Sequence, residues 1–376
     1  MHEASSALGL LVLLIVADCR YRRSMPKPVS TGLSRLLVRL APLMDDRVKA
    51  SAAPFDHSIE FRPYAGSRLW GWTHFGVFVP SLPGPHRYLN TMTLIGSTGT
   101  EIFDNDHLVD GDARGLSTVF SSTASSGNHH YRGYQPDDCA FEDDGSTLMW
   151  GDNLTIEVDL PTVNVVGRYD TFSVDLTLDV TDQVSYFVRA PFYQHLSLLA
   201  PYQGTITDHD GVTAISGLGT FEYARAMSQQ ALTKRAMPGR LKLPMDFFTY
   251  QVIQIDETTQ MLLTRVEARG QAACNLVHIR SVGGTAEAYE DVHFEVLTWA
   301  DPIVDELGRS MRMPRDFRWQ VRDADGRSVL DLTGECDSPM RFGHGRGYAG
   351  AFTYEALLRG ESKSGTAYIE WVDVRP

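Results

Sequence analysis

The sequence contains few cysteines, and their spacing excludes two kinds of site. Only four occur in 376 residues, and no two of them form a C-x-x-C pair. Cysteine zinc sites need such closely spaced ligands, and disulfide-stabilised domains are small and dense in cysteine. Cys19, Cys139, Cys274 and Cys336 therefore predict neither a zinc site nor a disulfide framework, and they favour a reducing compartment.

Basic residues are also scarce. The chain has 34 Lys and Arg against 47 Asp and Glu, which gives a formal net charge of -13. Proteins that bind nucleic acids concentrate Lys and Arg on one surface, where they neutralise phosphates. No stripe of Lys and Arg offsets the acidic residues here, so we expect no nucleic-acid partner.

Signatures of cofactor-dependent and metal-dependent enzymes are missing as well. The sequence has no G-x-S-x-G elbow, no H-E-x-x-H, no Walker loop and no dinucleotide fingerprint. His129-His130 and residues 104–107 lie in segments rich in Ser, Gly and Asp. Histidines and acids in such segments are usually solvated loop residues rather than metal ligands. Residues 343–347 lack the following helix that would bind a phosphate, so they indicate a tight connection between strands. We expect neither a metal nor a cofactor.

Long hydrophobic runs are absent apart from one near the N-terminus. Residues 8–17 form a run of about ten apolar residues, whereas a membrane-spanning helix needs about 20. Arginines at positions 20, 22 and 23 follow this run, which reverses the charge order of an export signal. Three interpretations are open: translation from Met25, a short membrane-proximal segment, or a poor signal peptide.

Residues 30–46 have the periodicity of a helix. Leucines recur at helical spacing with Arg35 and Arg39 opposite, which predicts a short N-terminal amphipathic helix. Such a helix packs on the barrel that follows, or it makes peripheral contact with a membrane. We expect a cytoplasmic protein, with membrane association through this helix as the alternative.

From Phe61 onward the sequence predicts β-structure. Residues 69–79 and 88–95 are rich in β-branched and aromatic residues, and in 153–160 and 172–180 acids occupy one strand face and aliphatic residues the other. The second pattern is typical of antiparallel strands with one solvated face. Strands of this length at regular spacing predict an all-β barrel or sandwich.

The last third of the chain has a distinctive order of strands. A hairpin at residues 250–266 precedes strands at 293–299 and 317–321, and Tyr354-Glu355 precedes Gly365-x-x-Tyr368-x-Glu370. This order resembles the C-terminal half of the AttH-like family, which includes the carotenoid 1,2-hydratases (hydroxyneurosporene synthases) and the lipocalin-like pericyclases. In that family the closing strands carry Y-W-E-G and G-x-G-Y-x-E patterns. The resemblance covers about residues 60–376 and identifies a divergent member.

The resemblance implies two consecutive lipocalin-like (calycin-type) antiparallel β-barrels packed side by side. An aromatic opening strand, a meander and a closing strand occur once in residues 60–215 and again in 217–376. The expected units are an apolar segment with the amphipathic helix at 1–54, a first barrel at 55–216 and a second at 217–376. Residues 226–243 are expected to form an exposed linker.

Residues 217–225 match the strand that carries the chemistry of the hydratases. That strand reads approximately G-x-a-W-x-D-H, and its acid is assigned the protonation of a carbon-carbon double bond. Here Glu222-Tyr223 replaces Asp-His, so the resemblance assigns the proton donor to Glu222. Such an acid must be kept neutral, which burial in an apolar barrel achieves. The alternative is a structural ion pair between Glu222 and Arg225 or Arg265.

Other residues on the predicted strands complete the candidate site. His74 shares a strand face with Trp70 and Trp72, so it joins Glu222 and Tyr223 as a catalytic candidate, with a hydrogen-bonded core histidine as the alternative. Aromatic faces stabilise cations. The expected substrate-binding residues are Trp70, Trp72, Phe75, Tyr250, Trp299, Arg265 and Tyr354.

Three further residues are candidates by position. His195 lies near the junction of the two barrels, which places it at the rim of a cavity. Glu355 and Glu370 match acids on the closing strands of the family. They form either an acid/base pair or structural contacts with the backbone, Arg265 and Arg341.

Three functions are compatible with these features. The first is binding of a hydrophobic small molecule (polyene, terpenoid, steroid or polyketide-like) in a barrel cavity, with cofactor-free acid-catalysed hydration, isomerisation or cyclisation. The second is a non-catalytic carrier of a hydrophobic ligand. The third is a purely structural double barrel.

Overall fold

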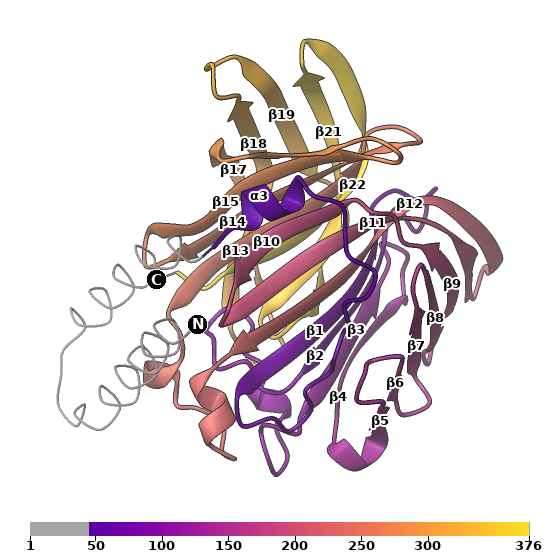
Figure 1. The fold of residues 1–376 in the computed structure, drawn as a ribbon, viewed down its shortest axis with the longest axis vertical. Helices are drawn as coiled ribbons and strands as arrows, with labels where there is room; N and C mark the ends of the chain where they lie inside the picture. The colour runs from indigo at the N-terminus through magenta and orange to yellow at the C-terminus, as the bar shows by residue number, and fades with distance from the viewer. Residues whose placement is uncertain (1–44, 376) are drawn as a thin grey trace.

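The computed structural model describes residues 45–375, which fold almost entirely into antiparallel strands (Figure 1). One α-helix, α3 (Arg47–Ser51), packs against the first sheet. Within residues 45–375, none of the helices has the length and hydropathy that crossing a bilayer requires. The apolar run, the alternative start at Met25 and nearly all of the predicted amphipathic helix lie outside the described residues.

The first sheet runs in the order β4-β3-β2-β1-β12-β11-β9-β8-β7-β6-β5, and β10 pairs with β11. Short 3-10 helices, Asp106–Leu108 and Pro136–Asp138, lie in its loops. The strands are β1 (Trp70–Val79), β2 (Leu89–Ile95), β3 (Ser117–Ser122), β4 (His129–Tyr134), β5 (Cys139–Phe141), β6 (Thr147–Trp150), β7 (Leu154–Asp159), β8 (Thr162–Arg168), β9 (Ser173–Asp179), β10 (Val184–Ala190), β11 (Tyr193–Asp208) and β12 (Gly211–Met227).

The second sheet runs in the order β16-β15-β14-β13-β22-β21-β19-β18-β17, and β20 pairs with β21. Between the sheets lie the 3-10 helices Gln229–Leu232 and Gly239–Leu241. The strands are β13 (Met245–Gln254), β14 (Thr259–Ala268), β15 (Gln271–Ser281), β16 (Ala286–Tyr289), β17 (Asp291–Val304), β18 (Ser310–Arg322), β19 (Ser328–Cys336), β20 (Arg341–Gly343), β21 (Gly347–Leu358) and β22 (Glu361–Asp373).

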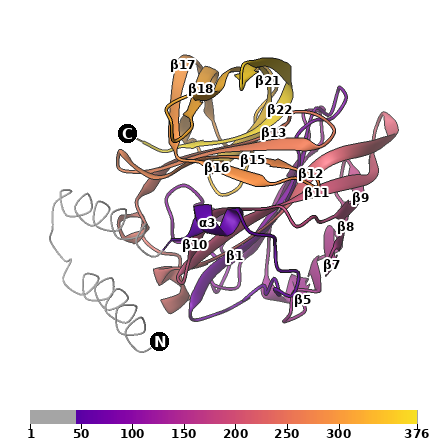
Figure 2. The same cartoon turned by 45° about the horizontal axis from the view of Figure 1, so that its top comes forward.

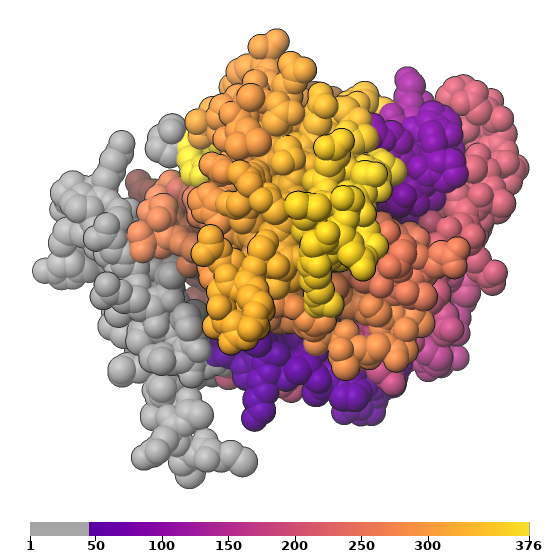
Figure 3. All heavy atoms as spheres, turned by 90° about the horizontal axis from the view of Figure 1, so that it is seen from above, coloured from indigo at the N-terminus to yellow at the C-terminus, as the bar shows by residue number. Residues whose placement is uncertain are grey.

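The two sheets form lipocalin-like barrels that lie side by side, which confirms the predicted all-β double barrel (Figure 2). Seen from above, the second barrel covers the centre of the molecule and parts of the first project beyond it (Figure 3). The change from one sheet to the other falls between Met227 and Met245, because β12 crosses residue 217 and still pairs with β1 and β11. The division into domains at 54/55 and 216/217 stays a prediction.

The contact between the two barrels, the seam, includes β1 and β13. These strands are buried on both faces along most of their length. Along β1, Phe75 and Val77 join the core inside the first barrel, whereas Trp72 and Phe78 pack with residues of the second. Successive side chains of a strand point to opposite faces, so one strand serves both cores. Strands with two buried faces read as nearly continuous apolar runs, and the aromatic-rich sequence of β1 has this character.

A buried arginine connects the two sheets across the seam. Arg280 on β15 is fully buried, and its guanidinium donates to the Ser197 carbonyl at 2.6 Å and to the Ser197 hydroxyl at 3.0 Å. The same group donates to Oε1 of Gln260 at 2.7 Å. Burial lowers the pKa of Arg280 to about 10, so the side chain keeps its charge at neutral pH.

Replacement of Arg280 by Met should destabilise the protein strongly. The change leaves the Ser197 carbonyl and the Gln260 amide oxygen buried without this donor, and a buried polar group left unsatisfied costs about 1–3 kcal/mol. Arg318→Met is the control, because Arg318 pairs with Asp331 where the side chains are 37% and 33% exposed, and solvent-exposed pairs contribute little to stability. Urea unfolding measures both, and equal losses would contradict the role of Arg280.

Candidate functional site

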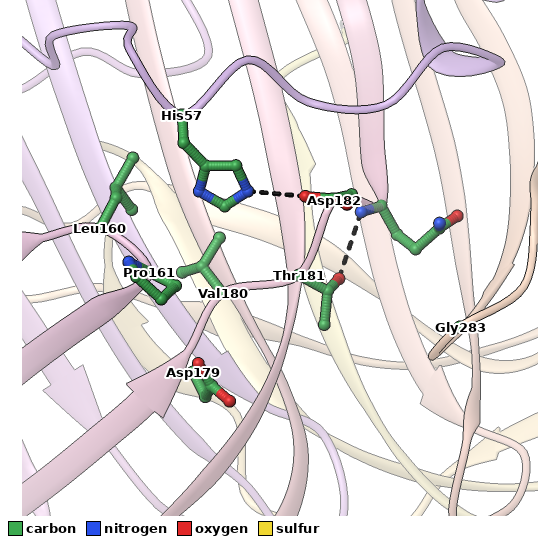
Figure 4. Close-up of a pocket in the computed structure, with 9 residues that line it drawn as sticks. His57, Leu160, Pro161, Asp179, Val180, Thr181, Asp182 and Gly283 are labelled. Atoms are coloured by element: carbon green, nitrogen blue, oxygen red, sulfur yellow. Dashed lines mark hydrogen bonds and ion pairs between the residues drawn. The ribbon is translucent and has the colours of Figure 1, made fainter.

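One pocket is an open surface groove whose lining offers few side chains suited to catalysis (Figure 4). It has a volume of about 510 Å³ and is lined by loop residues such as Leu160, Pro161 and Gly283. His57 Nε2 lies 2.8 Å from Asp182 Oδ1, and both side chains reach solvent. These polar side chains contact each other at the solvent-exposed surface, and the functional candidates lie elsewhere.

A second cavity, of about 160 Å³, lies in the seam between the barrels. Its walls are largely apolar, and titratable side chains of both sheets reach it. The apolar and aromatic lining residues include Trp72, Phe78, Met92, Leu94, Ile102, Phe103, Phe187, Phe192, Tyr193, Phe248 and Tyr250. The titratable groups at its wall include His74, His195, Glu222, His344 and Glu370. An apolar cavity with a few convergent polar groups is the usual form of a small-molecule site.

Strand register places three of these groups on one face of the first sheet. His74 on β1 and His195 on β11 are both opposite Ala224 of β12, the strand between them. Glu222 lies two residues before Ala224 and so points to the same face. The three side chains therefore converge although they are far apart in the sequence.

Glu222 accepts a hydrogen bond from a residue of the second sheet. Its side chain is 2% exposed, and Tyr250 on β13 donates a hydrogen bond to its Oε1 at 2.5 Å. The other carboxylate oxygen, Oε2, lies 3.4 Å from His195 Nε2. Burial and the charge of Glu222 raise the pKa of Tyr250 well above its ordinary value, so the phenol remains a donor.

Glu370 is a second buried carboxyl in the same cavity. It lies on β22 in register with Tyr250, and Tyr368 donates to its Oε1 at 3.2 Å. His344 Nε2 lies 4.0 Å from Glu370 Oε2. Burial, together with the charge of Glu222, raises the pKa of Glu370 well above its usual range. Both effects favour the protonated form of Glu370 over the ionised one.

Two histidines of the cavity, His74 and His344, are neutral. His74 is 4% exposed, and its Nδ1 lies 2.7 Å from the carbonyl of Thr93. A carbonyl can only accept, so Nδ1 carries the hydrogen and Nε2 carries a lone pair. Burial, with a smaller effect of His195, lowers the pKa of His74 to about 4. Burial also holds the pKa of His344 well below its ordinary value. His74 is thus both a hydrogen-bonded core residue and part of the cavity wall.

The structure brings six of the predicted candidates together at the cavity: Glu222, His74, Trp72, Tyr250, His195 and Glu370. Tyr223 does not join them. It points to the opposite face of β12, where it donates to the Arg62 carbonyl and packs against Phe75 inside the first barrel. Adjacent strand residues cannot share a face, so the proposed Glu222-Tyr223 pair is separated.

The remaining predicted residues lie away from the cavity lining. The ring of Trp70 packs against the Arg225 guanidinium, and Phe75 lies in the core of the first barrel. Trp299 is 42% exposed, and Arg265 forms an ion pair with Glu267. Tyr354 packs against Phe352 in the second barrel.

The predicted ion pairs of Glu222 are wrong, because Arg225 donates to Tyr64 and Arg265 is paired with Glu267. Glu355 is exposed and pairs in register with Thr333 and Ser364 rather than with Glu370. The expected acid/base pair of Glu355 and Glu370 therefore does not form.

Arg280 and His344 belong to this buried polar group although the sequence-based prediction omits them. Residues 276–280 read Leu-Val-His-Ile-Arg, and a charged residue that ends such an apolar run is a signal of a paired buried charge. His344 lies in the glycine-rich connection between β20 and β21. Its burial depends on contact with Phe103 and His74 of the first barrel, which no local pattern reveals.

Residues 92–376 match the family described as "Family of unknown function (DUF6670)", and the chain belongs to this family. No curated protein sequence matches the chain. Among solved structures, it is similar to kievitone hydratase from Nectria haematococca, with 12% identity and a TM-score of 0.56 over 86% of this chain and 94% of that one. It is also similar to a protein assigned as AttH from Nitrosomonas europaea, with 9% identity and a TM-score of 0.55 over 86% of this chain and 95% of that one. A third similar structure is CghA with Sch210972, with 12% identity and a TM-score of 0.51 over 86% of this chain and 98% of that one. At these identities the likeness shows a shared fold.

A glycine on β1 leaves the space in which the site is built. Gly76 is opposite Glu222, and a Cβ there would lie 2.7 Å from His74 Nε2 and 2.8 Å from Phe78 Cε2. Gly239 lies in the segment between the sheets, and a Cβ there meets no atom within 4 Å.

Gly76→Ala should lower stability by about 1–3 kcal/mol, because overpacking forces the buried rings to move. Gly239→Ala should leave stability unchanged or raise it by up to about 1 kcal/mol, since alanine reduces the entropy of the unfolded chain. Denaturant unfolding measures both variants. A Gly76→Ala protein as stable as the parent would show that the seam has more room than the structure indicates.

Proposed function

We propose that this member of the DUF6670 family binds an apolar small molecule in the seam cavity and catalyses cofactor-free acid/base chemistry on it, as a hydration, isomerisation or cyclisation. The observation that carries the proposal is the presence of two buried carboxyl groups in one aromatic-lined cavity, Glu222 from the first sheet and Glu370 from the second. Their partners differ, and so do the roles that they can take.

Glu370 is the proton donor in this proposal. It is 3% exposed, and the groups nearest to its carboxyl are the neutral Tyr368 and His344 rather than a cation. The family resemblance assigns this role to Glu222, but Glu222 accepts the short bond from Tyr250, and its charge partly offsets the lowering of the Arg280 pKa by burial. Glu222 therefore serves as a proton acceptor or a fixed negative charge.

The reaction of an alkene substrate then follows from the positions of these groups. Glu370 gives its proton to one carbon of the double bond, and the cation that forms at the other carbon lies among aromatic faces such as Phe103, Phe187 and Phe248. In a hydration, water adds to that carbon while the carboxylate left at Glu370 accepts the proton of the water, which restores the acid. In an isomerisation, the cation loses the proton of a neighbouring C–H to that carboxylate, and in a cyclisation a second double bond attacks the cation before the same proton loss.

Two fold neighbours are compatible with this proposal. One is a hydratase by name, and another, CghA, was solved with Sch210972 bound. Both support the expectation that a barrel pair of this kind accepts a small organic molecule. The apolar walls would also suit a carrier that performs no chemistry, and a seam without ligand is the structural alternative.

Deuterium transfer provides a test that works before the substrate is identified. The full chain is incubated in D2O with an apolar extract of the cells that produce it, and the extract is analysed by mass spectrometry. We expect a compound that gains deuterium at carbon with the parent protein. Glu370→Gln should slow this by about 10²–10⁴-fold, the usual contribution of a general acid, because the amide cannot deliver a proton. Glu355→Gln, at an exposed acid on β21, should have no effect.

Binding separates the enzyme from the alternatives. The labelled compound should co-purify with Glu370→Gln in native mass spectrometry, since the amide keeps the shape of the side chain. A compound that binds to both proteins and never gains deuterium would indicate a carrier. An extract from which no compound binds would contradict the ligand site itself.

A further inference from the structure

We propose that His74, His195 and Glu222 form a site for one divalent transition-metal cation. Their candidate ligand atoms, one from each residue, all lie within 4.8 Å of one another. The three residues come from β1, β11 and β12, which are adjacent in the sheet, so the backbone holds the group rigidly. The proposal departs from the sequence-based expectation of no metal, and it goes beyond the proposed acid/base chemistry.

Hydrogen bonds already orient each ligand as a metal site requires. Nδ1 of His74 donates to the Thr93 carbonyl, which leaves Nε2 as the lone-pair nitrogen. Nδ1 of His195 lies 3.3 Å from the Tyr193 hydroxyl, which can accept its hydrogen and leave Nε2 unprotonated. Oε1 of Glu222 accepts from Tyr250, which turns Oε2 toward His195. Metal-binding histidines typically donate their other N–H to such a partner.

One nitrogen of the proposed site lacks a hydrogen-bond partner. Nε2 of His195 is buried and has no hydrogen-bond partner among residues 45–375. It lies 3.4 Å from Oε2 of Glu222, and two ligands bound at about 2.0–2.1 Å to a tetrahedral cation are separated by about 3.3–3.4 Å. With His195 as the Nδ1–H tautomer, two acceptor atoms face each other, and a cation between them would bind both.

The ligand types indicate the class of metal. Two imidazoles with one carboxylate suit zinc or ferrous iron, whereas calcium and magnesium prefer oxygen ligands alone. Three protein ligands leave a coordination position open. All three residues line the seam cavity, so the open position would face a bound molecule there.

A second group of potential ligands supplies a matched control. Asp208, His209 and Asp210 also bring their ligand atoms within 4.8 Å of one another, but they lie at the turn between β11 and β12, where His209 and Asp210 are exposed. Exposed acidic groups of this kind are common without a metal. His209→Ala removes the imidazole of this second group without touching the seam.

The test uses the full chain after dialysis against EDTA. Titration calorimetry with Zn²⁺ should show one site that His209→Ala leaves unchanged. His195→Asn and Glu222→Gln should weaken it by more than about 100-fold, since even loss of a residue that only orients a ligand costs about 10–100-fold. Tyr250→Phe should fall within that smaller range. Co²⁺ should give visible absorption typical of nitrogen and oxygen ligands in the parent protein and not in His195→Asn.

Thermal unfolding keeps the test decisive if a variant folds poorly. Bound Zn²⁺ should raise the melting temperature of the parent and of His209→Ala, because a ligand that binds only the folded state stabilises it. It should not raise that of the seam variants. No saturable Zn²⁺ binding, or binding lost only in His209→Ala, would overturn the proposal. Deuterium transfer that persists with EDTA would leave the acid/base function intact, so the two proposals fail separately.

Discussion

The burial of the seam strands on both faces is the constraint on which the rest of the structure depends. β1 and β13 are buried along almost their whole length, because one face fills a barrel and the other packs on the partner barrel. Water cannot satisfy polar groups in such a place, and each unpaired buried group costs about 1–3 kcal/mol. Pairing across the seam avoids this cost, as between Tyr250 and Glu222 and between Arg280 and Ser197.

The same constraint makes the seam chemically distinctive. Among the described residues it contains the fully buried guanidinium of Arg280 and the buried carboxyls of Glu222 and Glu370. Two carboxylates close together in an apolar medium do not both ionise, because burial and mutual repulsion each disfavour the second charge. Glu222 accepts a 2.5 Å hydrogen bond from the phenol of Tyr250, whereas Glu370 accepts a longer bond of 3.2 Å from Tyr368 and has His344 Nε2 at 4.0 Å. The environment thus separates the two carboxyls into an acceptor and a donor.

The sequence predicts the all-β class well because strand alternation is a local feature, and the double barrel follows from the resemblance to the AttH-like family. It also identifies Glu222, His74, Trp72 and Tyr250, which reach the cavity. It cannot tell which face of β12 meets the seam, since both faces are buried and both look apolar, and so it predicts Tyr223 beside Glu222. The pairing of Glu370 with Tyr250 and the burial of Arg280 depend on the register and packing of distant strands. No local pattern encodes those contacts.

The protonation state of Glu370 is the central claim, and infrared difference spectroscopy tests it directly. The spectrum of the parent protein at neutral pH is compared with that of Glu370→Gln, both with EDTA present. The account predicts a carbonyl band of a protonated carboxylic acid in the parent that is missing in the variant, because burial and the charge of Glu222 raise the pKa of Glu370 and keep it neutral. A difference spectrum that shows only the loss of an ionised carboxylate would contradict it.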